Sequence, residues 1–127
     1  MPKFAANLTM LFTELPFLER FAAASKANFK AVEFLFPYDF LLEDIQQRLE
    51  VNGLKLVLHN FPAGDWAAGE RGIACWPDRE EEFRAGVATA IRYAKGLGVH
   101  YDPKRVQTLR PQCPEAPQGQ AKWADSP

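Results

Sequence analysis

Two hydrophobic spacings alternate along the first 98 residues of this sequence. Short segments with period-two alternation, or with runs of Val and Phe, predict three strands, at residues 4–9, 30–36 and 54–60. After each strand, apolar residues recur at three- and four-residue spacing, which predicts three helices, at residues 13–26, 41–51 and 78–97. This order predicts parallel strands joined by right-handed crossovers. The fold class is therefore α/β, and both a doubly wound sheet and an α/β barrel fit the pattern.

The predicted helices carry recognisable end signals. Thr13 can cap the first helix, and Asn52-Gly53 can close the second because glycine adopts a left-handed backbone readily. Asp78 and Glu81 have the spacing of a capping box at the start of the third helix. The apolar face predicted for this helix consists of Phe83, Val87, Ile91, Ala94 and Leu97.

Two segments break the alternation. Residues 61–77 have no clear period, and a loop of this length inside a compact domain is typically functional or disordered. After Gly98 the chain becomes rich in proline and glutamine where a fourth strand is expected. We therefore divide it into a domain at residues 1–98 and a divergent tail at residues 99–127, expected to be disordered. The tail is either an ordinary flexible C-terminus or an altered, truncated or frame-shifted end.

Charge and composition exclude several functions. A net charge of −1 argues against a surface for nucleic acid or anionic membranes. No apolar run approaches the roughly 20 residues needed to span a bilayer. Cys75 and Cys113 form no motif, which favours reduced thiols and a cytoplasmic location.

Three polar residues are predicted to share one face of the sheet. Strand parity places Asn7, Glu33 and His59 opposite the apolar side, near the carboxyl ends of their strands. Active sites of α/β barrels lie at that end. Each residue also has a structural interpretation: His59 as a buried histidine, Glu33 as a partner of Lys55 or Arg71, and Asn7 as a hydrogen-bonding filler. Their common direction favours a site.

The segments FAANLTMLF, VEFLFPYDF and LHNFPAGDWAAGERGIACWPDREEEFRAGV resemble the hydroxypyruvate isomerase family of xylose-isomerase-like barrels. The resemblance covers residues 1 to about 98 and implies the first three strand–helix units of a (β/α)₈ barrel, which usually needs about 250 residues. It also implies interconversion of hydroxypyruvate and tartronate semialdehyde through an enediolate.

This resemblance suggests roles for six residues. We assign His59 and Glu33 as catalytic, with His59 donating to a substrate oxygen, and Asn7 as substrate-binding. Trp66, Glu70 and Arg71 would belong to a loop that closes over the substrate, with Arg71 holding its carboxylate. The alternatives are a surface pair between Glu70 and Arg71, and a Trp66 that packs the loop down.

The resemblance implies that later strands, absent here, supply the acid–base carboxylates and the ligands of a divalent metal, Mg²⁺ or Mn²⁺. We assign no metal ligand in this chain, since consecutive Glu80, Glu81 and Glu82 point in different directions around a helix. The expected partner is a small hydroxy-oxo acid, with no nucleic acid or membrane. Three strands leave an open edge, so we expect weak stability or self-association. The alternatives are a non-catalytic truncated or frame-shifted product that at most binds a partner or a small acid, and another chemistry on the same fold, such as a sugar epimerase or a phosphoesterase acting on nucleic acid.

Overall fold

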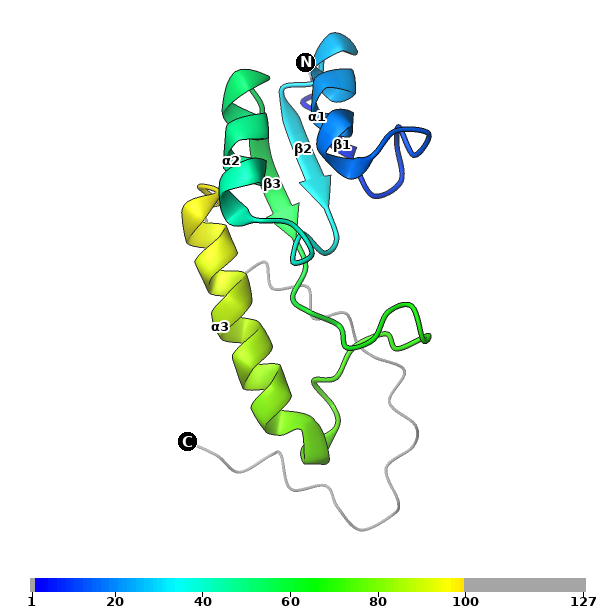
Figure 1. Ribbon diagram of the computed structural model, residues 1–127, viewed down its shortest axis with the longest axis vertical. Helices are drawn as coiled ribbons and strands as arrows, with labels where there is room; N and C mark the ends of the chain where they lie inside the picture. The colour runs from blue at the N-terminus through cyan, green and yellow to red at the C-terminus, as the bar shows by residue number, and fades with distance from the viewer. Residues whose placement is uncertain (1, 100–127) are drawn as a thin grey trace.

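The computed structural model describes residues 2–99. Within them lie three parallel strands and three α-helices in strict alternation, with a short 3-10 helix before the last (Figure 1). The strands are β1 (Ala5–Asn7), β2 (Ala31–Phe34) and β3 (Lys55–His59), and the helices are α1 (Phe17–Lys26), α2 (Leu42–Val51), η1 (Pro77–Arg79) and α3 (Glu80–Gly96). The prediction of three strand–helix units is confirmed. Apart from Val99, the tail lies outside the described residues.

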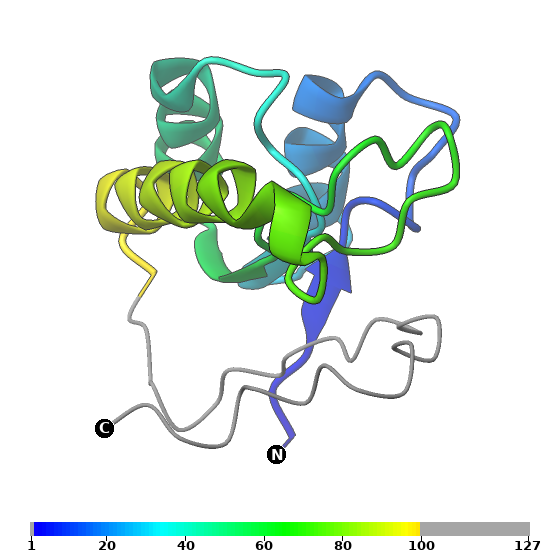
Figure 2. The same cartoon turned by 90° about the horizontal axis from the view of Figure 1, so that it is seen from below.

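The sheet has the order β1-β2-β3, and each neighbouring pair is parallel. All three helices lie on one side of it, as the view from below shows (Figure 2). This arrangement is that of a barrel wall, whose helices cover only the outer face of the strands. No helix in the described part of the chain is both long enough and apolar enough to cross a membrane.

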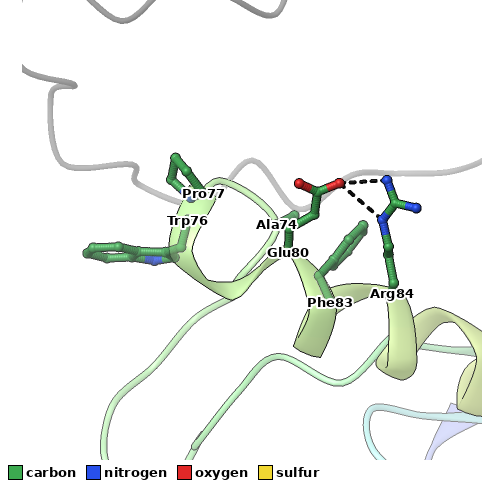
Figure 3. Close-up of a pocket in the computed structure, with 6 residues that line it drawn as sticks. All are labelled: Ala74, Trp76, Pro77, Glu80, Phe83 and Arg84. Carbon is green, nitrogen blue, oxygen red and sulfur yellow. Dashed lines mark hydrogen bonds and ion pairs between the residues drawn. The ribbon is translucent and has the colours of Figure 1, made fainter.

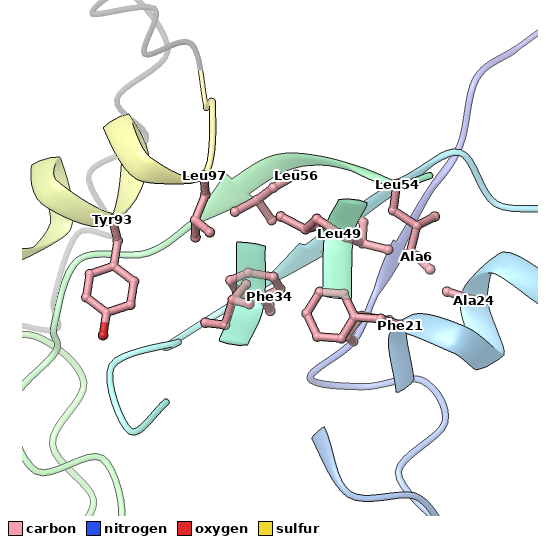
Figure 4. Close-up of a cluster of buried hydrophobic side chains, with 12 residues drawn as sticks. Ala6, Phe21, Ala24, Phe34, Leu49, Leu54, Leu56, Tyr93 and Leu97 are labelled. Carbon is pink, nitrogen blue, oxygen red and sulfur yellow. The ribbon is translucent and has the colours of Figure 1, made fainter. Parts of the chain in front are cut away.

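The core lies between this sheet and its helices (Figure 4). Val32 and Phe34 of β2 are buried against Phe21 of α1 and Ile45 of α2. Phe17 bridges these elements, with ring-centroid distances of 5.3 Å to Phe34 and 4.7 Å to Phe40. Each such apolar side chain contributes about 1.5–3 kcal/mol by burial. Gly53 closes α2 with a φ of +60°, as its sequence position predicts.

The alternation predicted for the third strand fails at Leu58. Val32 pairs with Leu56, but Glu33 pairs with Leu58 and Phe34 with His59, so Val57 is an extra residue in β3. This irregularity reverses the parity of everything after it. Leu58 is consequently 43% exposed, whereas Leu54 and Leu56 are buried.

Both predicted side-chain caps are absent. A turn in which the Leu15 N–H donates to the Phe12 carbonyl precedes α1, so the helix begins after Pro16 and Thr13 caps nothing. The 3-10 helix precedes α3, whose first turn likewise has no side-chain cap, so the capping box of Asp78 and Glu81 does not form.

The buried face of α3 differs in part from the predicted one. Ala94 and Leu97 are buried as expected, but Ile91 is 44% exposed and its neighbours Ala90 and Tyr93 face the core. The Tyr93 hydroxyl donates to the Phe40 carbonyl at 2.8 Å, which satisfies its polar end.

Candidate active site

The carboxyl ends of the strands and the long loop after β3 meet at the same end of the sheet (Figure 1). Asn7 and Glu33 lie in register on β1 and β2, and the Asn7 Nδ2 donates to Glu33 Oε1 at 3.1 Å. The Asn7 Oδ1 accepts from the Thr9 N–H at 3.0 Å, which fixes the direction of the amide. The structure thus brings these two predicted site residues together, both half-buried.

His59 does not join them. Because of the register shift, it pairs with Phe34 rather than Glu33, so the prediction that His59 shares a face with Asn7 and Glu33 is wrong. Its Nδ1 lies 3.3 Å from both the Tyr38 hydroxyl and the Asn60 carbonyl oxygen. Its Nε2 is buried and has no hydrogen-bond partner among the described residues. Burial lowers the pKa of His59 below its usual value, and the hydrogen bond to the Asn60 backbone opposes part of this shift. Because the net shift is downward, the ring is mostly neutral at pH 7.

The loop between β3 and α3 is built around one acidic side chain. Glu70 Oε2 accepts from the Asp65 N–H at 2.5 Å, and Glu70 Oε1 forms an ion pair with Arg79. Asp65 in turn accepts from the Ala68 N–H through Oδ1 at 2.9 Å. The predicted alternative of a side-chain pair between Glu70 and Arg71 is therefore wrong, because the Glu70 carboxylate is taken by Arg79.

Arg71 instead packs on Trp66. Its guanidinium carbon lies 3.9 Å from the centre of the indole ring, a cation–π distance. The Arg71 Nη1 donates to the carbonyls of Trp66 and Glu70 at 3.0 and 2.8 Å. Trp66 also contacts Phe36, with ring centroids 5.0 Å apart, which connects the loop to the segment that follows β2. Arg71 has no carboxylate partner in the described part of the chain.

Arg79 is the residue that sequence reasoning missed. Besides Glu70, it binds Glu82 with two hydrogen bonds of 2.8 Å, from Nε and Nη2. These hydrogen bonds and charges lower the pKa of Glu70 and of Glu82 and raise that of Arg79. The spacing of Arg79 and Glu82, three residues apart at a helix start, was the available signal for the second contact. No short-range pattern in the sequence indicates the contact of Arg79 with Glu70.

A small pocket of about 200 Å³ lies where the loop enters α3. Its lining comprises Ala74, Trp76, Pro77, Glu80, Phe83 and Arg84 (Figure 3). An ion pair between Arg84 and Glu80, at 2.6 Å, occupies its polar side. None of the predicted site residues lines this pocket, so it is separate from the candidate site.

The described residues hold no ligand set for a metal centre. Across residues 2–99, no group of three or more His, Cys, Asp or Glu side chains could hold a metal ion. Glu80 and Glu82 are each engaged by an arginine, Arg84 and Arg79 respectively. These residues do not fit a divalent ion.

Comparison with known proteins agrees with this architecture. Residues 21–123 match the model of the family described as xylose isomerase-like TIM barrel, and the chain belongs to that family. It is 61% identical over 98 residues to hydroxypyruvate isomerase of Escherichia coli (strain K12), and 52% identical over 98 residues to 2-oxo-tetronate isomerase of Cupriavidus necator. Each match covers 77% of this chain and 38% of the relative.

A solved structure shows the same fold. The crystal structure described as AP endonuclease, family 2, from Brucella melitensis superposes with a TM-score of 0.75 at 55% sequence identity. The match covers 78% of this chain and 38% of that one. The chain therefore spans somewhat more than a third of the length of these relatives, and its three strand–helix units form part of a (β/α)₈ barrel.

Proposed function

We propose that this chain forms the substrate-carboxylate side of an isomerase acting on small 3-hydroxy-2-oxo acids, of which hydroxypyruvate is the simplest. The observation that carries the proposal is the Arg71 guanidinium, which is exposed, stacked on Trp66 and without a carboxylate partner among the described residues. The names of the relatives, hydroxypyruvate isomerase and 2-oxo-tetronate isomerase, support the reaction class. Both named substrates carry a carboxylate next to a carbonyl and a hydroxyl.

The free donors of Arg71 suit that carboxylate. Nη1 is already bound to two backbone carbonyls, which leaves the N–H groups on Nε and Nη2 for two parallel hydrogen bonds to a ligand. Trp66 holds the guanidinium plane and excludes water from one side of it. Because Trp66 contacts Phe36, a carboxylate on Arg71 would lie near the carboxyl end of β2, on which Glu33 stands.

The isomerisation moves one carbon-bound proton. A base removes the proton from the hydroxyl-bearing C3, an enediolate forms, and a proton returns to C2 while the C3 hydroxyl proton passes to the C2 oxygen. For this chain alone we assign the base to the Glu33 carboxylate, held by Asn7, in place of the later-strand carboxylates that the resemblance implies for a whole barrel. A positioned acid–base group gives about 10²–10⁴-fold. His59 takes no part in this step, because its buried Nε2 lies on the opposite parity of the sheet from Glu33.

A second candidate is binding of the acid without turnover. Glu33 and His59, the two residues predicted from the sequence to be catalytic, lie on opposite parities of the sheet, which favours this candidate. The two functions differ in one measurable quantity, the rate at which the purified chain converts hydroxypyruvate.

The test combines binding with turnover. Hydroxypyruvate affinity is measured by titration for the unmodified chain, for Arg71→Ala and for the control Arg84→Ala, whose guanidinium pairs with Glu80. Turnover is assayed with and without Mg²⁺ or Mn²⁺, with the intact E. coli relative alongside. We expect Arg71→Ala alone to lose affinity by about tenfold or more, as for a charge-assisted hydrogen bond of 1.5–3 kcal/mol. Unchanged affinity in Arg71→Ala would disprove the carboxylate assignment.

A further inference from the structure

The carboxylate of Glu70 joins two parts of the loop to the start of α3. One oxygen accepts from the Asp65 N–H at 2.5 Å, and the other pairs with Arg79. Arg79 is itself fixed by its two hydrogen bonds to Glu82 in the first turn of α3. The loop segment around residues 65–70 is thereby connected to the 17-residue helix α3 by two successive ion pairs, from Glu70 to Arg79 and from Arg79 to Glu82.

The backbone has been adapted to this carboxylate. Gly64 has a φ of +82°, and a Cβ built there would lie 2.1 Å from Glu70 Oε2 and 2.8 Å from Ile73 Cγ2. Any side chain at residue 64 would therefore displace the carboxylate from its position. Gly69, in the same loop, has a φ of +97° but nothing within 4 Å of its virtual Cβ.

The same turn sets the place of Arg71. The Glu70 N–H donates to the Asp65 carbonyl at 3.0 Å, and the Gly69 N–H donates to the Trp66 carbonyl at 3.1 Å. The Trp66 and Glu70 carbonyls are thus brought close enough to share the Arg71 Nη1. Holding Glu70 in place therefore also holds the guanidinium over the indole ring.

We propose that Glu70 and Arg79 are positioning residues, which hold the Arg71–Trp66 pair in the geometry that receives a carboxylate. This role rests on the proposed function, because it takes Arg71 as the group that binds the substrate. It replaces the predicted role of Glu70 as a substrate contact, since both of its carboxylate oxygens already have partners within the protein. Glu70 and Arg79 act on the ligand only through Arg71.

A charged side chain that is already ordered loses less conformational freedom when it binds. Releasing Arg71 from Trp66 should therefore weaken hydroxypyruvate binding by about three- to tenfold, the range expected for ordering one long side chain. The effect should be smaller than that of Arg71→Ala, which removes the donors themselves. The release of Arg71 should also change the position of the Trp66 ring before any ligand is added.

The experiment uses the ¹⁵N-labelled full chain and follows the Trp66 indole N–H and the Arg71 Nε–H by NMR, with Trp66→Phe to assign the indole signal. Glu70→Gln and Arg79→Gln are compared with Arg84→Gln, which breaks an ion pair within α3 whose two side chains form no hydrogen bond with residues 64–71. Arg79→Lys tests rescue, since lysine keeps the charge beside Glu70. Far-UV circular dichroism checks that each variant folds, and hydroxypyruvate is titrated into each.

We expect Glu70→Gln and Arg79→Gln to shift both signals toward their free-chain positions and to weaken hydroxypyruvate binding. Arg84→Gln should change neither quantity, and Arg79→Lys should recover part of both. Unshifted Trp66 and Arg71 signals in folded Glu70→Gln would overturn the positioning role, whatever the ligand does. If those signals do depend on Glu70 while the unmodified chain fails to bind hydroxypyruvate, the proposed function fails and the contact network stands.

Discussion

Asn7 and Glu33 face each other across adjacent parallel strands, with the Asn7 amide nitrogen 3.1 Å from a Glu33 carboxylate oxygen. The other end of the amide accepts from the Thr9 backbone, so its orientation is determined on both sides. A half-buried carboxylate at a strand end is stabilised by such a donor.

Replacing Asn7 by aspartate should destabilise the protein. Two carboxylates would then face each other, and the Thr9 N–H would be the remaining donor at this position. We expect a loss of about 1–3 kcal/mol in the free energy of unfolding at pH 7, measured by urea denaturation. Asn28→Asp, at an exposed residue after α1, is the control. Equal losses in the two variants would contradict a special role for the pair.

The stability of the chain should fall as the pH drops below about 6.5. Burial lowers the pKa of His59 in the folded state, so the unfolded state, with a pKa near 6.5, binds the proton first. The contribution of a neutral His59 is complete above that value and is lost as the pH falls toward the folded-state pKa. Urea denaturation at pH 7.5 and 5.5 measures this loss, which His59→Gln should reduce. His100→Gln, at the other histidine of the sequence, separates the two sites. A pH dependence that His59→Gln leaves intact would refute this origin.

Gly64→Ala should disturb the loop more than Gly69→Ala does. Both glycines have positive φ values, so both variants carry a backbone cost of about 1–2 kcal/mol. Only at residue 64 does the added Cβ meet the Glu70 carboxylate and Ile73. Hydrogen exchange of the Asp65 amide, which donates to Glu70, should accelerate in Gly64→Ala and stay slow in Gly69→Ala. Similar exchange rates of the Asp65 amide in both variants would show that the Glu70 carboxylate moves aside without losing its hydrogen bond to Asp65.

Self-association of the chain should depend on β3, the strand at one edge of the sheet. β3 has one paired neighbour, β2, within the described residues, and Val57 and Leu58 on it are both more than two-fifths exposed. We expect the unmodified chain to associate with increasing concentration, and Leu58→Lys to shift it toward monomer in sedimentation velocity. Val51→Lys, at the exposed end of α2, is the matched control. A monomer with a sharp, concentration-independent unfolding transition would refute the expectation.

The order of strands and helices could be predicted because their hydrophobic spacings differ. The register shift in β3 could not, since Leu56, Val57 and Leu58 are all apolar and every parity fits such a run. The exposed position of Leu58 and the separation of His59 from Glu33 both follow from that single extra residue.

One part of the candidate site could likewise be predicted from the sequence and another part could not. Asn7 and Glu33 end short strands of clear parity, and they meet as expected. The ion pair of Glu70 with Arg79 spans nine residues of irregular chain, and only the three-dimensional path of the loop brings the two together. On α3, Val87 and Ile91 form one apolar stripe and Ala90 and Tyr93 another, and the sequence alone does not choose between them.

The contacts of the loop that carries Arg71 have a consequence for the order of folding. Asp65 and Glu70 are five residues apart and Arg79 and Glu82 three, whereas Asn7 and Glu33 are 26 apart. Short chain closures are fast and lose little entropy, while pairing of distant parallel strands is slow. The turn that carries the arginine we assign to the ligand is therefore closed by short-range contacts, which can form while the sheet beside it is still being assembled.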